Sequence, residues 1–273
     1  MARRVVLIAR AEHFSPHSVG KDAAILTAVA QQLRLAGVEC LMAGPEEHLS
    51  ARWPDGPLDG CLSMGRDEAT LAWLERQQMP VVNAASAVRL CNRRALLMQR
   101  LEARHIAVPP LFGDDGYWVK RGDGCAECAA DVQYAADRDT AEQLAAAMRQ
   151  RGITAVDLRA HVVGDLVKCY GVSGTGFFRY YYPGDDGDWK FGDEQHNGAP
   201  RHYPFCGDRL QQVVSEAARV AGLDVYGVDC IVRPDGSVVL IDLNDWPSFS
   251  RCRDDAAKAI AQRSIQLMEK KQA

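Results

Sequence analysis

Long hydrophobic segments are missing from this 273-residue chain, which excludes a membrane-spanning helix as its main feature. The longest apolar runs are short, such as Val5–Ala9, whereas a helix needs about 20 apolar residues to cross a bilayer. Because Arg10 and Glu12 follow this run closely, it indicates a first buried strand and not a signal peptide. We therefore expect a cytoplasmic protein with no membrane partner.

An excess of positive charge is also missing. The 32 Lys and Arg residues are outnumbered by 36 Asp and Glu residues, which leaves a net charge of −4. A nucleic-acid partner requires a basic surface, so we expect none. The nine cysteines are an odd number and indicate reduced thiols. Cys125 and Cys128 lack the second Cys or His pair that a zinc site requires, so we interpret them as thiols in a loop.

The first 82 residues alternate between apolar strands and amphipathic helices. This alternation predicts a parallel sheet with helices on both faces. The expected strands are 4–9, 38–43, 60–64 and 80–83, and the expected helices are 18–35 and 67–77. Ligands of such sheets bind beyond the carboxyl ends of the strands. Those ends carry Arg10, His13, Gly65, Arg66 and Asn83.

The rest of the chain predicts a different, mixed pattern. A single long helix is expected over 86–105, and a strand over 117–120 runs into a Gly-rich turn. Further helices are expected over 139–151, 210–221 and 254–270, and further strands over 132–134, 153–163, 165–172 and 177–182. Residues 185–202 are polar and Gly-rich, and they predict a loop.

The most informative segment is a predicted hairpin with strands over 226–232 and 238–244. In a regular register Arg233 faces Val238, so Asp229 faces Asp242, and Asn244 lies on the same face as Asp242. Two facing carboxylates repel each other, and Mg²⁺ with oxygen ligands offsets that repulsion. The alternatives are a solvent-facing pair or one protonated acid.

Lysine is scarce, because only seven of the 32 basic residues are lysines. Two of them occupy predicted strands: Lys120 precedes the Gly-rich turn, and Lys168 lies within GDLVKCYGV. Both positions suit contacts with nucleotide phosphates, and the alternative is a pair of surface lysines.

These features together resemble the ATP-grasp superfamily from about Asn83 to the end of the chain. The segments that carry the resemblance are VVN (81–83), CNRRALLMQRLEARHIAVPP (91–110), WVK (118–120), VDLRAHVVGDLVKCYGV (156–172), GVDCIV (227–232) and VVLIDLNDWPSF (238–249). The resemblance implies an α/β ATP-grasp fold with an N-terminal α/β pre-ATP-grasp domain. Its expected parts are the pre-domain (1–82), a central lobe (83–160) and a C-terminal lobe (161–273).

The resemblance also implies roles for individual residues. Lys120 and Lys168 contact ATP, Arg93 or Arg94 reaches phosphate, and residues 122–126 form a loop that closes over the triphosphate. The strand between the lobes reads the adenine edge, with Val156, Arg159 and His161 as candidates; it has no Glu, so no ribose ligand is identified. Asp229, Asp242 and Asn244 match the Mg²⁺ ligands. Arg179, together with Lys168, is the candidate catalytic residue that clamps the transferred phosphoryl group or the acceptor.

The resemblance leaves three functions open. The first is a carboxylate–amine ligase that forms an acyl phosphate, as in the ribosomal-S6-modification and glutathione-synthetase group. The second is a small-molecule kinase similar to the inositol-phosphate kinases, which NRRALL, VVGDLVK and NDWPSF favour but the net acidic charge opposes. The third is a nucleotide-binding protein without catalysis. The acceptor and the oligomeric state are not identified by the sequence.

Overall fold

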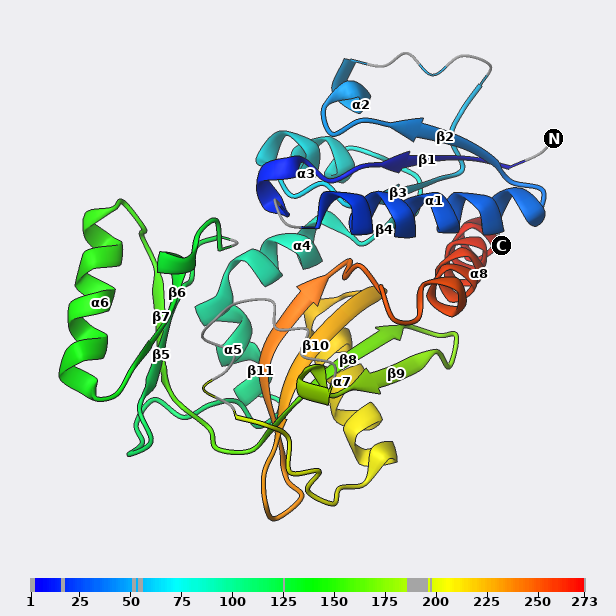
Figure 1. Cartoon of the computed structure of the whole chain (residues 1–273). Helices are drawn as coiled ribbons and strands as arrows, with labels where there is room; N and C mark the ends of the chain where they lie inside the picture. Colours follow the sequence, from blue (N-terminus) through cyan, green and yellow to red (C-terminus); the bar gives the residue numbers. More distant parts are fainter. Residues whose placement is uncertain are drawn as a thin grey trace.

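A computed structural model describes residues 3–15, 18–50, 53, 56–124, 126–185, 196 and 198–272. The chain forms three parts (Figure 1): an N-terminal domain, a small central lobe and a C-terminal lobe. In the described residues no helix has both the length and the apolar character needed to cross a membrane.

The N-terminal domain is built on a parallel sheet with strand order β2-β1-β3-β4. Its elements are β1 (Arg4–Ile8), α1 (Val19–Leu35), β2 (Glu39–Ala43), α2 (Glu47–Ser50), β3 (Gly60–Ser63), α3 (Glu68–Glu75) and β4 (Val81–Val82). After Arg4, β1 is entirely apolar because both of its faces are covered. Val5 and Leu7 belong to a core shared with α1, whereas Val6 and Ile8 belong to one shared with α3. The predicted alternation of strands and helices is confirmed.

The expected single helix over 86–105 is wrong. The structure has two helices, α4 (Ala85–Asn92) and α5 (Arg94–Glu102), separated at Arg93, whose φ of −105° and ψ of 69° are not helical. Neither Gly nor Pro lies at this break, so its cause is not local. The break places Arg94 at the first position of α5, where its side chain forms ion pairs with two other segments of the chain.

The central lobe is an antiparallel sheet, β6-β5-β7, covered by one helix (Figure 1). Its elements are β5 (Tyr117–Arg121), β6 (Val132–Ala135), α6 (Arg138–Gln150) and β7 (Val156–Ala160). Val119 from the sheet and Ala141, Ala145 and Met148 from α6 form its core. This small core leaves the other face of the sheet available for the cavity between the lobes.

The C-terminal lobe is an antiparallel sheet with strand order β11-β10-β8-β9. Its elements are β8 (Asp165–Val172), β9 (Phe178–Tyr181), α7 (Gly207–Ala221), β10 (Val225–Val232) and β11 (Val238–Asp245). One face packs on α5 and α7 through a core that includes Leu97, Leu210, Val228 and Leu243. Short 3-10 turns occur at Glu12–Phe14, Ala129–Asp131 and Pro183–Asp185.

The last helix, α8 (Arg253–Gln272), leaves the C-terminal lobe and lies against α1 (Figure 1). Ile260 of α8 is completely buried, and so are Trp246 and Phe249 of the segment before it. All three belong to the same core cluster as Val5 and Leu7 of β1. The core of the N-terminal domain is therefore completed by residues from the far end of the chain.

Candidate functional site

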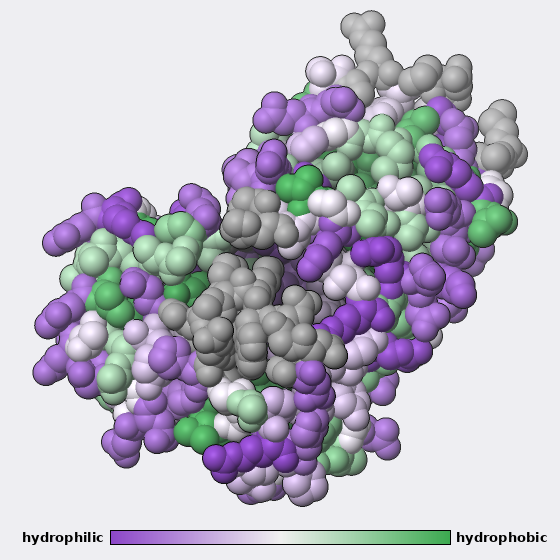
Figure 2. All heavy atoms as spheres, in the orientation of Figure 1, coloured by the Kyte–Doolittle hydropathy of each residue, from purple (hydrophilic) through white to green (hydrophobic). Residues whose placement is uncertain are grey.

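A cavity of about 520 Å³ lies where the three parts of the chain meet. Figure 2 shows the surface hollowed between the central lobe at the left and the N-terminal domain at the top. Among the described residues, nine Lys and Arg side chains and six Asp side chains line the cavity. This excess of three positive charges stands against a net charge of −4 for the whole chain. The cavity therefore suits an anionic ligand.

The predicted pairing of Asp229 with Asp242 is confirmed, although the register at the hairpin tip is not the expected one. Val232, not Arg233, pairs with Val238. A β-bulge then shifts the register by one residue before Asp229 is reached, with Ile241 as the extra residue. A bulge of this kind re-aims side chains, and both acids line the cavity.

Positive charges surround the two acids. Lys168 pairs with Asp229 across β8 and β10, and its Nζ lies 3.9 Å from an Asp229 carboxylate oxygen. Arg94 donates to Asp242 Oδ1 over 2.7 Å, and the Leu243 N–H donates to the same oxygen over 3.0 Å. Burial by itself raises the pKa of Asp242, but the charges of Arg94 and Lys120 and these hydrogen bonds lower it to about 2. Asp242 is therefore ionised at neutral pH.

Arg94 also joins the two lobes. Its Nε donates to Asp157 on β7 over 2.9 Å, while Nη1 holds Asp242 on β11. Nη2 in addition contacts the carbonyl of Ile241, the bulged residue. The neighbouring Arg93 is exposed and does not line the cavity, so its assignment to the nucleotide site is not supported. The position of the helix break decides which of the two arginines enters the cavity. The sequence does not reveal where this break lies.

Lys120 lies at the centre of the charges, next to Asp157 across the β5–β7 ladder. Burial and the charge of Arg94 lower its pKa to about 8, and nearby Asp242 partly opposes this effect. Its Nζ also lies 5.7 Å from the centre of the Trp118 ring. Lys120 is partly buried, and an anion bound beside it would stabilise its charged form.

The segment between the lobes lines the cavity only in part. Arg159 and His161 line it, whereas Val156 packs on the core of the central lobe and does not. Arg159 also donates to Asp157 over 3.0 Å. The indole N–H of Trp118 donates to His161 Nδ1 over 3.0 Å, and burial lowers the pKa of His161. The backbone N–H of His161 is already donated to the carbonyl of Gly116.

Arg179, the expected clamp for the phosphoryl group or acceptor, does not line the cavity. Its side chain is 48% exposed, lies 3.3 Å from Asp255 and stacks over the Phe177 ring. Tyr181, two residues further along β9, pairs with Lys168 and lines the cavity instead. The role given to Arg179 therefore has no geometric support.

At the other end of the cavity, two arginines of the N-terminal domain bind the segment that follows β11. Arg10, just after β1, donates to the carbonyl of Trp246 over 2.8 Å, and Arg66, after β3, lies 2.5 Å from the Asp245 carboxylate. Arg10 also lies 3.4 Å from Asp22 of α1. The sequence did not reveal these contacts. The ends of the strands predict where a ligand binds, but they do not predict that the segment after β11 lies against the two arginines.

The other side chains expected at the strand ends have different positions. His13 and Gly65 do not line the cavity. Asn83 is fully buried, accepts the N–H groups of Asp224 and Val225 over 2.8 Å each, and donates to the Val225 carbonyl over 2.7 Å. Asn83 therefore joins the N-terminal domain to β10, and it is structural.

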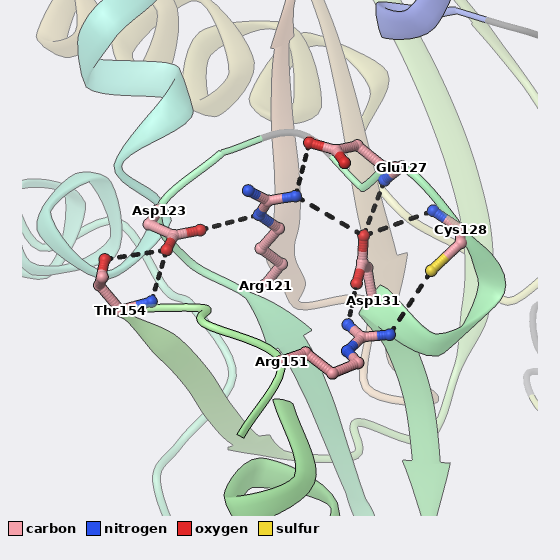
Figure 3. Close-up of polar contacts among 7 residues, drawn as sticks. All are labelled: Arg121, Asp123, Glu127, Cys128, Asp131, Arg151 and Thr154. Atoms are coloured by element: carbon pink, nitrogen blue, oxygen red, sulfur yellow. Dashed lines mark hydrogen bonds and ion pairs between the residues drawn. The ribbon is translucent and has the colours of Figure 1, made fainter. Parts of the chain in front are cut away.

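The loop between β5 and β6 is anchored on both sides (Figure 3). Asp123 accepts the Thr154 N–H over 2.6 Å and the Arg121 Nε–H over 2.8 Å. Asp131 accepts the N–H groups of Glu127 and Cys128 over 2.8 and 3.3 Å. Gly124 and Ala126 line the cavity. Of the predicted loops, Cys125 and residues 186–195 and 197 lie outside the described residues.

Comparisons identify the fold. No protein-family model and no curated protein matches the chain. A RimK-domain ATP-grasp protein from Sphaerobacter thermophilus matches with a TM-score of 0.66 and 18% identity over 96% of this chain and 99% of that chain. The D-alanine–D-alanine ligase from Coxiella burnetii matches with a TM-score of 0.70 and 13% identity over 99% and 97%. The Bacillus anthracis enzyme of that name, complexed with ATP, matches with a TM-score of 0.68 and 12% identity over 99% and 100%. The chain has the ATP-grasp fold.

Proposed function

We propose that the protein is an ATP- and Mg²⁺-dependent carboxylate–amine ligase that acts through an acyl phosphate. The observation that carries this proposal is the pair Asp229 and Asp242, which face each other across a β-ladder at the wall of a cationic cavity. Two of the similar structures are named as D-alanine–D-alanine ligases, and this supports the ligase class.

The donor set at this wall fits magnesium bound to a nucleotide. In the part of the chain that the structure describes, no group of three His, Cys, Asp or Glu side chains is placed to hold a metal alone. Two carboxylates, Asp229 and Asp242, and the amide oxygen of Asn244 suit Mg²⁺, which takes few protein ligands and completes its shell with waters and phosphates. Bound there, Mg²⁺ neutralises phosphate charge.

The chain's own residues position the reactants. Lys120 and Lys168 approach the cavity from the two lobes and contribute fixed positive charge for a triphosphate. The loop around Gly124 is anchored at both ends, which keeps it beside the cavity. From this position it can cover the phosphates and exclude water from an acyl phosphate. Catalysis in this proposal consists of orientation and charge stabilisation.

The alternative is a small-molecule kinase, inositol-phosphate-like or sugar. The charges at the end of the cavity formed by the N-terminal domain disfavour one form of it, a kinase whose acceptor carries several phosphates. Arg10 and Arg66 lie there, but each already has a carboxylate partner, Asp22 and Asp245. A ring that carries several phosphates requires many unpaired cations. These two paired arginines do not supply such charge at this end of the cavity.

Calorimetry tests the proposal. We expect ATP to bind the wild type more tightly with Mg²⁺ than without it, and Asp242→Asn to lose this difference. Asp208→Asn, the same change at an exposed position in the first turn of α7, should retain it. Trapping with hydroxylamine then separates the chemistries: a hydroxamate formed from ATP and a carboxylate supports the ligase. A wild type that does not bind ATP contradicts the proposal, and ADP release that requires an alcohol, without hydroxamate, indicates a kinase.

A further inference from the structure

The strand β11 ends one residue after Asn244, the third candidate metal ligand, and the chain then bends. Asn244 pairs with Gly227 of β10 and lines the cavity. Trp246, two residues later, has a φ of 41°, in the left-handed region that a bulky residue rarely adopts. Pro247 then packs on Gly227 so closely that a Cβ atom there would lie 3.0 Å from its ring. Such a backbone conformation persists only where surrounding contacts hold it in place.

The N-terminal domain supplies contacts that hold this bend. Arg10 donates to the carbonyl of Trp246 over 2.8 Å and to that of Asp245 over 3.4 Å. Arg66 donates to the Asp245 carbonyl over 3.2 Å and lies 2.5 Å from the Asp245 carboxylate. The indole N–H of Trp246 donates to the carbonyl of Val82 in β4 over 3.3 Å, and its side chain is completely buried. The N-terminal domain therefore helps to fix the two residues that follow this candidate ligand.

The two arginines are themselves held in place by buried ion pairs. Arg10 lies 3.4 Å from Asp22 of α1, and the two side chains are 8% and 7% exposed. The side chains of Arg66 and Asp245 are 9% and 1% exposed. Separating such a pair leaves a buried charge without its partner, so the geometry of the pair is strongly maintained. The bend is thus held against the sheet of the N-terminal domain.

We propose that Arg10 and Arg66 are positioning residues for the candidate metal ligand Asn244. By holding the backbone of the two residues that follow it, they fix the direction of the Asn244 side chain in the cavity. This inference rests on the proposed Mg²⁺-dependent function, and it adds that the N-terminal domain contributes to the binding of metal with nucleotide. Groups that orient a metal ligand typically change metal affinity by about 10- to 100-fold.

The test is the effect of Mg²⁺ on ATP binding, measured by calorimetry with no acceptor present, so that contacts with an acceptor do not contribute. Arg66→Gln and Arg10→Gln should each weaken ATP binding about tenfold with Mg²⁺, and neither should weaken it without Mg²⁺. Arg263→Gln is the matched control. Arg263 forms an ion pair with Asp224 over 2.7 Å, is 17% exposed and does not line the cavity, and its loss should leave both affinities unchanged.

A double-variant experiment separates positioning from a general loss of stability. Asn244→Ala should also weaken ATP binding with Mg²⁺, and adding Arg66→Gln to it should cause no further loss, because both changes act through one side chain. Circular dichroism checks that each variant is folded. If Arg66→Gln does not fold, Arg66→Lys replaces it. This variant keeps a charge beside Asp245, but its ammonium lacks the planar fork of the guanidinium, so ATP binding with Mg²⁺ should still be weaker.

Two results overturn the inference while the proposed function stands. One is a folded Arg10 or Arg66 variant that binds ATP with Mg²⁺ as tightly as the wild type does. The other is full additivity of Arg66→Gln and Asn244→Ala, which would show that the arginine acts independently of this ligand. A wild type in which Mg²⁺ does not strengthen ATP binding instead contradicts the proposed function itself, and the inference with it.

Discussion

At the candidate site, a single side chain, that of Arg94, contacts both lobes. One guanidinium joins Asp157 of the central lobe to Asp242 of the C-terminal lobe and also contacts the bulge at Ile241. It therefore fixes the orientation of one candidate metal ligand and the distance between two lobes. A planar group with five donors is suited to this, and a lysine is not.

Arg94→Gln should lower the free energy of unfolding by about 2–4 kcal/mol, because it leaves two carboxylates without their shared counter-charge. Chemical unfolding in urea measures the loss. The matched control is Arg219→Gln, which breaks an exposed pair with Glu216 on α7, and its unfolding midpoint should equal that of the wild type. Equal midpoints for both variants would show that Arg94 is not a structural bridge.

Lys120 should react with amine reagents at an unusually low pH. With a pKa of about 8, about a tenth of its amines are neutral at pH 7 and about nine tenths at pH 9, whereas an ordinary lysine is mostly charged throughout. Peptide mass spectrometry after brief acetylation should find Lys120 modified faster than exposed Lys258 at pH 8. ATP should slow the reaction because phosphates stabilise the charged amine. Modification of Lys120 no faster than that of Lys258 contradicts the lowered pKa.

At the scale of elements, the β10–β11 hairpin shows what sequence periodicity can predict. Alternation and the turn at Gly236 predict two strands, and both exist. The expected register of Arg233 opposite Val238 is wrong, but the one-residue bulge corrects it before Asp229. The pairing of Asp229 with Asp242 was thus predicted correctly. The register used for that prediction holds from Asp229 toward Tyr226, but not between the bulge and the turn. Short-range pattern carries no information on bulges, since they depend on contacts such as that between Arg94 and Ile241.

Two other positions, Arg93 and Arg179, show the same limit of sequence pattern. The break at Arg93 and the orientation of Arg179 depend on partners more than 60 residues away in the sequence, Asp157, Asp242 and Asp255. Helix propensity and strand alternation do not include such partners. The order of the strands and helices could therefore be predicted, whereas the choice between neighbouring arginines could not.

The loop between β5 and β6 depends on Asp131, which is almost completely buried (Figure 3). Asp131→Ala removes the acceptor of two backbone N–H groups and the partner of Arg151. We expect the loop to loosen and trypsin to cleave after Arg121 several times faster than in the wild type, with about 1–3 kcal/mol lost from the free energy of unfolding. Asp139→Ala, at an exposed position of α6, is the control. Equal cleavage rates in the two variants would contradict the anchoring role.

For the whole molecule, the domain division expected from the sequence and the distribution of the core differ in one respect. The core of the N-terminal domain contains Trp246, Phe249 and Ile260, which lie far outside residues 1–82. Arg10 and Asn83 add polar contacts across the same boundary. The N-terminal domain and the segment from Trp246 to α8 therefore share one packed interface.

This shared interface predicts that residues 1–82 do not fold on their own. Each large apolar side chain that is fully buried contributes about 1.5–3 kcal/mol, and a domain is stable by about 5–15 kcal/mol in total. A fragment that lacks Trp246, Phe249 and the buried face of α8 loses a stabilising free energy as large as the total stability of a domain. Calorimetry of the full chain should show a single cooperative transition, and circular dichroism of the 1–82 fragment should show none. A cooperative melt of the isolated fragment, or two separate transitions in the full chain, would show that the shared core does not couple the two regions.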